Sequence, residues 1–167
     1  MKNKLNTRKD ILSLLEKNAK LTAEEIAVYT GVPEADVRAE IEKMEKEQII
    51  CGYGAFINWK RVDNEHLTAL IEVKVTPSRG KGFKRIAERI YRFDEVKAVY
   101  LMSGAYDLAV IIEGRSLNEI AAFVSDKLAP LESVLSTATH FVLNKYKDHG
   151  IIFNEQGDKD GRMIITP

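Results

Sequence analysis

The sequence predicts an α+β protein in two parts, with three short helices followed by elements in the order β-α-β-β-α-β. Three observations support this prediction. Apolar residues recur at helical spacing through the first fifty residues. From Leu67 onward, segments with the apolar–polar alternation of strands are interspersed with segments whose apolar residues recur at helical spacing. Within residues 98–112, AVYLMSGAYDLAVII, two apolar runs meet at a tight break that is typical of a hairpin.

Capping residues divide the first fifty residues into three helices. Thr7-x-x-Asp10 resembles a capping box at the start of the first helix, and Thr22-x-x-Glu25 is a better one at the start of the second. Gly31 permits the turn that ends the second helix, and Pro33 suits the first turn of the third. The third helix has an apolar face formed by Val37, Ile41 and Met44. Two helices joined by a short glycine-containing turn predict a helix-turn-helix.

The second part contains four expected strands and two expected helices. An extended segment at 49–59 and a polar segment at 60–66 precede it. Strands are expected at 71–75, 96–102, 108–112 and 134–146. Helices are expected at 83–93 and from a capping box at Ser116 and Glu119 to Pro130. This is the split βαβ or ferredoxin-like arrangement, and right-handed crossovers place both helices on one face of an antiparallel sheet.

The other face of this sheet also carries apolar residues and needs a cover. A second copy of the chain is the simplest cover, so the sequence predicts an obligate dimer. The tail contains two apolar patches, 151–153 and 163–165, which fit an extra hairpin, with a partly disordered tail as the open alternative. The predicted organisation is a winged helix-turn-helix at 1–50, a hinge strand and linker at 51–66, a ferredoxin-like domain at 67–147 and a C-terminal extension at 148–167.

The composition excludes several classes of protein. Hydrophobic residues make up 45% and charged residues 30% of the chain, which is ordinary for a globular protein. Lys+Arg and Asp+Glu both number 25, so no global charge draws the chain to nucleic acid or membrane. No stretch approaches the ~20 apolar residues of a membrane-spanning helix. The single cysteine and the lack of a secretory signal predict a cytoplasmic protein.

The break at residues 103–107, SGAYD, is the strongest candidate for a ligand site. Tyr106 and Asp107 place a ring, a hydroxyl and a carboxylate beside the turn, which suits capture of a small polar ligand. An ordinary solvated hairpin turn is the alternative, because Gly and Asp are common turn residues.

Several groups of residues, taken in their order and spacing, resemble the Lrp/AsnC family of leucine-responsive and asparagine-responsive regulators of bacteria and archaea. They are Ile11-Leu12, Glu25-Ile26-Ala27, Ile49-Ile50-x-Gly52-Tyr53, Ser103-Gly104-Ala105-Tyr106-Asp107-Leu108 and Thr137-x-Thr139. The resemblance covers residues 5–146 and implies a transcription regulator. Its first domain would bind DNA. Its second would assemble dimers into tetramers or octamers and bind an amino acid or related small metabolite between subunits.

The resemblance also implies roles for particular residues. The implied effector site comprises Ser103, Gly104, Ala105, Tyr106, Asp107, Thr137 and Thr139. An amino acid's ammonium needs a carboxylate, which Asp107 offers, and its carboxylate needs donors, which the turn backbone and the threonines offer. The alternative is that Tyr106 packs against the partner subunit and Asp107 only caps the turn. The candidate DNA-binding residues are Arg38 as first choice and Pro33, Glu34 and Asp36 at the start of the third helix, with Arg8 and Lys9 of the basic first-helix region as contacts to the DNA backbone.

The third helix departs from the family pattern in its charge. Residues 34–47, EADVRAEIEKMEKE, contain six acidic and three basic side chains, a net charge of −3. Relatives usually carry basic residues where Ala39 and Glu40 stand, and Gly where Gln48 stands. Phosphate contacts supply much of the affinity for DNA, although Glu and Asp can accept hydrogen bonds from cytosine. Contact with another protein is therefore the alternative function of this helix.

An enzyme is the remote alternative, because some proteins similar to this family are sirohaem decarboxylases. That chemistry needs clustered arginines and a placed histidine, whereas His66, His140 and His149 are scattered along the chain. The sequence lacks nucleotide-binding glycine motifs, and one cysteine with three distant histidines argues against zinc. The sequence therefore predicts no catalytic residue, no metal and no cofactor.

Overall fold

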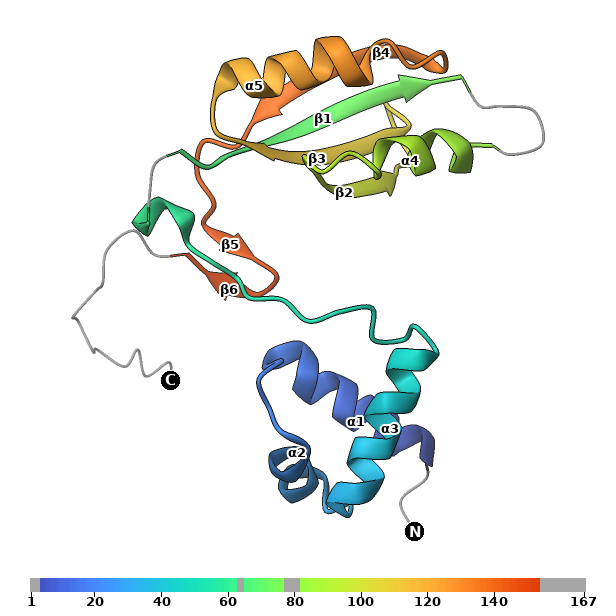
Figure 1. Ribbon diagram of the computed structural model, residues 1–167, viewed down its shortest axis with the longest axis vertical. Coiled ribbons are helices and arrows are strands. Elements are labelled where there is room, and N and C mark those ends of the chain that lie inside the picture. Colours follow the sequence, from blue (N-terminus) through green and yellow to red (C-terminus); the bar gives the residue numbers. More distant parts are fainter. Residues whose placement is uncertain (1–3, 63–64, 77–81, 154–167) are drawn as a thin grey trace, which may run out of the picture. The chain divides into compact units, whose positions relative to one another are not determined.

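A computed structural model describes residues 4–62, 65–76 and 82–153 of the chain. The chain forms two compact units, Met1–Phe56 and Ile57–Pro167. The boundary between them lies inside the hinge predicted at residues 51–66. Figure 1 shows that the first unit is built of helices and that the second contains the sheet. None of the helices within the described ranges is long and apolar enough to cross a membrane.

The first unit packs three helices around one apolar core. The helices are α1 at Lys4–Lys17, α2 at Ala23–Thr30 and α3 at Glu34–Lys46. All three contribute buried side chains, namely Ile11, Leu15, Ile26, Val37 and Met44. Each of these residues lies on an apolar stripe that the sequence marks, so the predicted helix-turn-helix of α2 and α3 is confirmed.

The two N-terminal capping boxes have different outcomes. At Thr22 the box is confirmed. The Thr22 hydroxyl accepts a hydrogen bond from the Glu25 N–H at 3.2 Å, and the Glu25 carboxylate accepts one from the Thr22 N–H at 2.8 Å. The box at Thr7 is wrong, because α1 already begins at Lys4 and Thr7 lies inside it. Pro33 is the N-cap of α3 and not part of its first turn.

Replacing Thr22 with alanine is expected to lower the free energy of unfolding by about 1 kcal/mol, because an N–H at the start of α2 loses its acceptor. Denaturant unfolding of the full chain measures this loss. Thr7→Ala is the matched control, since it removes the same hydroxyl from the interior of α1 and leaves every cap intact. Equal losses in the two variants would contradict the assigned start of α2.

Two residues with left-handed backbone follow the helices α2 and α3. Gly31 ends α2 with a φ of 69°, as the sequence predicts. Gln48 has a φ of 55° just after α3, in a region that favours glycine. This backbone conformation gives a physical reason for the glycine that the resemblance leads one to expect where Gln48 stands.

Residues 51–58 follow α3 without helix or strand. They pair with no other strand within the described parts of the chain, so the predicted wing and hinge strand do not form here. The Tyr53 hydroxyl donates to the Glu45 carboxylate at 2.8 Å and ties this segment to α3. Burial, together with this contact, raises the pKa of Tyr53.

The second unit is a four-stranded antiparallel sheet with its helices on one face (Figure 1). The strands are β1 at Leu67–Val75, β2 at Val96–Leu101, β3 at Leu108–Gly114 and β4 at Val134–Phe141. The helical elements are α4 at Lys84–Ile90, α5 at Leu117–Ala122 and a π-helical continuation, η2, at Phe123–Leu128. The order β2-β3-β1-β4 confirms the ferredoxin-like fold.

Alternation along the strands separates a helix-covered face from an open face. On β1, Ile71 is fully buried among residues of α4, α5 and η2, and Leu70 next to it faces the open side. The register places Leu70 opposite Ile111 of β3. The apolar residues of the open face are Leu70, Ala98, Tyr100, Ala109, Ile111 and Ala138. The sheet therefore has the second apolar face that the sequence predicts.

The helix after β3 begins differently from the prediction. The Ser116 hydroxyl accepts from the Glu119 N–H at 3.1 Å, but the Glu119 carboxylate accepts from the Arg115 N–H at 2.7 Å, so only half of the predicted capping box forms. Phe123 at the start of η2 is buried in the core, whereas Leu117 at the start of α5 is 55% exposed.

The end of the chain also differs from the prediction. β4 ends at Phe141 and does not continue to residue 146. A short hairpin forms from β5 at Lys147–Asp148 and β6 at Ile151–Ile152, so the tail turns earlier than expected. The second apolar patch, 163–165, lies outside the described residues. A 3₁₀ turn, η1 at Trp59–Arg61, opens the polar segment.

Candidate functional site

The turn at residues 103–107 joins β2 to β3 and is attached to the end of β1. The Met102 N–H donates to the Asp107 carbonyl at 2.8 Å, which closes the turn. The Asp107 N–H donates to the Val73 carbonyl at 3.1 Å. Ser103, Gly104 and Ala105 are exposed, whereas Tyr106 and Asp107 are half-buried. The turn therefore presents one ring and one carboxylate that are partly shielded from water.

The Asp107 side chain has a structural contact that the sequence does not reveal. Its Oδ2 accepts a hydrogen bond from the Val75 N–H at 2.9 Å. The pairing of β1 with β3 ends at Val73 and Leu108, so no strand residue of β3 lies opposite Val75 to serve this N–H. One carboxylate oxygen thus holds the last residue of β1, as the turn-capping alternative requires. A ligand contact through the other oxygen stays a prediction.

The two threonines lie at different distances from the turn. Thr137 of β4 pairs with Val73, so it flanks β1 on the side opposite Asp107. Two strand spacings separate the two residues by about 10 Å. Thr139 pairs with Ile71, so it lies two residues further along β4 from the turn than Thr137. The structure therefore brings Thr137 to the same end of the sheet as Asp107 and leaves Thr139 further away.

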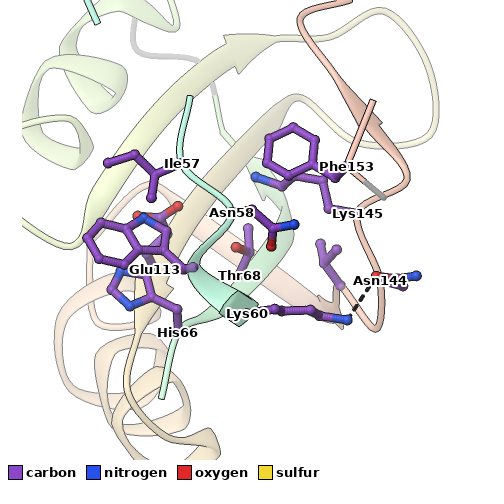
Figure 2. Close-up of a pocket in the computed structure, with 11 residues that line it drawn as sticks. Ile57, Asn58, Lys60, His66, Thr68, Glu113, Asn144, Lys145 and Phe153 are labelled. Atoms are coloured by element: carbon purple, nitrogen blue, oxygen red, sulfur yellow. Dashed lines mark hydrogen bonds between the residues drawn. The ribbon is translucent and has the colours of Figure 1, made fainter. Parts of the chain in front are cut away.

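A cavity of about 70 Å³ lies at the opposite end of β1 (Figure 2). Its walls include Trp59, which stacks on His66 with ring centroids 4.4 Å apart. Glu113 and Thr68 contribute from β3 and β1, and Lys60 donates to Asn144 at 2.8 Å on another side. The sequence does not reveal this cavity, because four separate segments of the chain line it and no motif joins them.

The three histidines have different surroundings. His66 stacks on Trp59, His140 lies 3.3 Å from the Glu72 carboxylate and His149 lies 2.7 Å from Asp148. Among the described residues, no group of three or more His, Cys, Asp or Glu side chains is arranged to hold a metal ion.

The predicted DNA-binding residues surround α3. Pro33, Glu34 and Asp36 lie at its exposed start, and Lys9 is exposed on α1. Arg38 lies 2.5 Å from the Glu34 carboxylate, one turn earlier on the same helix.

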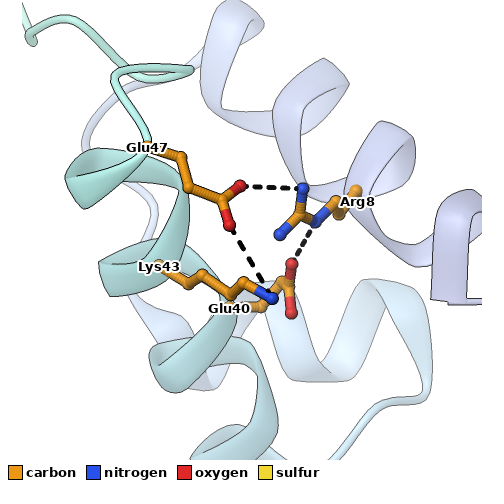
Figure 3. A network of polar contacts seen from close by, with 4 residues as sticks. All are labelled: Arg8, Glu40, Lys43 and Glu47. Carbon is orange, nitrogen blue, oxygen red and sulfur yellow. Dashed lines mark hydrogen bonds and ion pairs between the residues drawn. The ribbon is translucent and has the colours of Figure 1, made fainter.

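Arg8 reaches from α1 to α3 (Figure 3). It donates to Glu40 and lies 3.1 Å from the Glu47 carboxylate. The hydrogen bond to Glu40, and then that to Glu47, raise the pKa of Arg8 above its ordinary value. Lys43 extends the group through a 3.7 Å contact with Glu47. The guanidinium of Arg8, which the sequence assigns to the DNA backbone, is therefore already paired with two carboxylates of the protein.

Residues 68–152, which form most of the sheet unit, match the Lrp/AsnC ligand binding domain. The chain belongs to the Lrp/AsnC family. It is 53% identical to the HTH-type transcriptional regulator YugG of Bacillus subtilis (strain 168), over 95% of each chain. It is 33% identical to the HTH-type regulator PF1231 of Pyrococcus furiosus, over 83% of this chain and 91% of that protein.

A solved structure has the same fold as this Lrp/AsnC protein. It is the regulator NMB0573 of Neisseria meningitidis in complex with L-Met, with a TM-score of 0.70 and 23% identity over 89% of this chain and 94% of the other. A helix-turn-helix unit in a chain with a ligand-binding domain makes this protein a DNA-binding transcription regulator that responds to an effector.

Proposed function

We propose that the effector of this Lrp/AsnC regulator is a free amino acid bound beside the turn at residues 103–107. The half-buried Asp107 carboxylate is the observation that supports this proposal. One of its oxygens accepts the Val75 N–H, and the other suits the ligand's ammonium group. The Tyr106 hydroxyl and the exposed turn backbone offer donors for the ligand's carboxylate. The L-Met complex of the Neisseria meningitidis relative agrees with this class of ligand.

A second subunit completes this site in the proposal. One chain supplies the turn and Thr137, which leaves the ligand's side chain without an apolar wall. Pairing of two open sheet faces would form the dimer, and association of dimers into tetramers or octamers would cover the turn. The effector acts on DNA binding only if it binds two assembly states with unequal affinity.

Replacing Asp107 with asparagine is expected to abolish the stabilisation by amino acid while the protein stays folded. The amide oxygen still accepts the Val75 N–H, but the charge that attracts an ammonium is lost. Asp107→Ala is expected to lose the ligand response and also about 1–3 kcal/mol of stability, because the Val75 N–H is left unsatisfied. A thermal-shift screen of the standard amino acids measures both effects, since a ligand of the folded state raises Tm.

Glu113→Gln is the matched control for this experiment. It removes one negative charge from the other end of β3, where Glu113 lines the cavity of Figure 2. The control is expected to keep the full shift in Tm. A shift that survives in Asp107→Asn but disappears in Glu113→Gln would move the effector site to that cavity.

For DNA we propose that the exposed start of α3 reads base edges, with Arg38 as the principal contact. Arg38 is 63% exposed, so the guanidinium can leave Glu34 for a guanine. Glu34 and Asp36 are placed to accept hydrogen bonds from cytosine, and Lys9 to contact the backbone. The named relatives are HTH-type regulators, which favours DNA reading over protein contact as the role of α3.

A further inference from the structure

The helical unit has little positive charge with which to hold DNA. Residues 1–56 contain nine basic and ten acidic side chains, so the formal net charge of the unit is −1. Sequence-independent binding depends on lysine and arginine side chains that neutralise phosphates. The partners of these few basic side chains therefore have a large influence on non-specific affinity.

Both arginines of this unit are paired with glutamates of α3. Arg8 of α1 donates to Glu40, and these side chains are only 25% and 13% exposed. Arg38 pairs with Glu34 on its own helix, and those side chains are 63% and 46% exposed. Figure 3 shows that the first pair crosses from α1 to α3.

The two pairs differ in how readily DNA displaces them. An exposed pair one helical turn apart is weak and is screened by salt, so a phosphate or a base replaces Glu34 easily. The Arg8–Glu40 pair is partly shielded from water, and moving Arg8 to a phosphate would leave a part-buried carboxylate without its partner. Glu47 adds a second contact that keeps Arg8 in place. We therefore expect Glu40 to weaken DNA binding more than Glu34 does, because its arginine is released less easily.

We propose that Glu40 is a specificity-determining residue, which suppresses sequence-independent DNA binding by keeping Arg8 on the protein. DNA then gains affinity mainly from contacts that do not need Arg8, above all the contacts of α3 with base edges. The proposal rests on DNA binding by this unit and identifies the residue that limits the non-specific part of it.

The test measures binding of the full chain to a random-sequence DNA duplex over a salt series. Glu40→Gln removes the charge from the partner of Arg8 with little change in shape. It is expected to bind about fivefold to tenfold more tightly at ~0.1 M salt and to steepen the slope of log affinity against log salt by about one. In an Arg8→Gln background the same substitution is expected to change little, because no guanidinium is released.

Glu42→Gln is the matched control, because it removes one negative charge from the same helix. Glu42 is exposed and has no ion pair within the described parts of the chain. An equal gain in Glu42→Gln, or a gain from Glu40→Gln that persists without Arg8, would overturn the proposal in favour of net charge. If Glu40→Gln does not fold, Glu47→Gln replaces it, with a smaller gain expected and no gain overturning the proposal.

Failure of the proposal and failure of DNA binding give different results in this experiment. Salt-dependent binding by the wild-type protein with no gain in Glu40→Gln overturns only the role of Glu40. Wild-type binding that does not change with salt would overturn that role together with DNA binding through phosphate contacts.

Discussion

Replacing Ile111 with lysine is expected to prevent the proposed pairing of two open sheet faces, so that the protein sediments as a monomer. Ile111 lies at the centre of the open sheet face, between Leu70 of β1 and Ala98 of β2. In a symmetric dimer each substitution acts twice, and each lost apolar side chain contributes about 1.5–3 kcal/mol before the cost of burying the new charge. Association should therefore weaken about a thousandfold or more.

Sedimentation equilibrium measures this change, with circular dichroism as the check on folding. Ser136→Lys is the control, because Ser136 lies exposed at the end of the same face, opposite Lys74. That variant is expected to remain a dimer. A dimeric Ile111→Lys protein would show that the open face is not the interface, and a monomeric wild type would remove the dimer and the shared effector site together.

Replacing Ile71 with alanine is expected to lower the free energy of unfolding of the sheet unit by about 2–5 kcal/mol, because it leaves a cavity in the core. Ile71 is fully buried on the central strand β1, among residues of α4, α5 and η2. Denaturant unfolding measures the loss. Leu135→Ala on β4 is the control, since Leu135 is 68% exposed and is expected to change stability by less than about 0.5 kcal/mol. Equal losses would contradict the assignment of the covered face.

The two substituted residues, Ile71 and Ile111, lie on neighbouring strands but on opposite faces of the sheet. Ile71 and Val73 alternate with Glu72 and Lys74, so the pattern predicts which side chains share a face. The pattern does not say how far each face is buried. The helices that cover Ile71 and leave Ile111 on the open side come from segments outside the strand, and only their packing distinguishes the two faces.

Capping patterns show how far local sequence predicts the helices. The patterns at Thr7 and Thr22 are similar, yet only Thr22 begins a helix. Thr7 is preceded by residues that also adopt helical backbone, so its hydroxyl is not needed at an end. At Ser116 the residue types are right, but the Glu119 carboxylate accepts from the Arg115 N–H and not from the N–H of Ser116.

The candidate sites were predictable as segments but not as sets of contacts. The turn at 103–107 is visible as a break between apolar runs. The hydrogen bond of Asp107 to Val75 and the pairing of Arg8 with Glu40 each join residues 32 positions apart. Which groups meet over that distance depends on strand register in one case and on helix packing in the other.

The order of helices and strands, the helix-turn-helix and the family resemblance all follow from local periodicity and short motifs, because these properties depend on neighbours within one or two turns of chain. Three further properties could be seen only in the folded chain. They are the ion pair of Arg8 with Glu40, the hydrogen bond of Asp107 with the Val75 N–H and the cavity beside Trp59. Each of them depends on contacts between segments that are distant in the sequence. The strength of those contacts depends on burial and on interatomic distances, which are set only when the segments pack together.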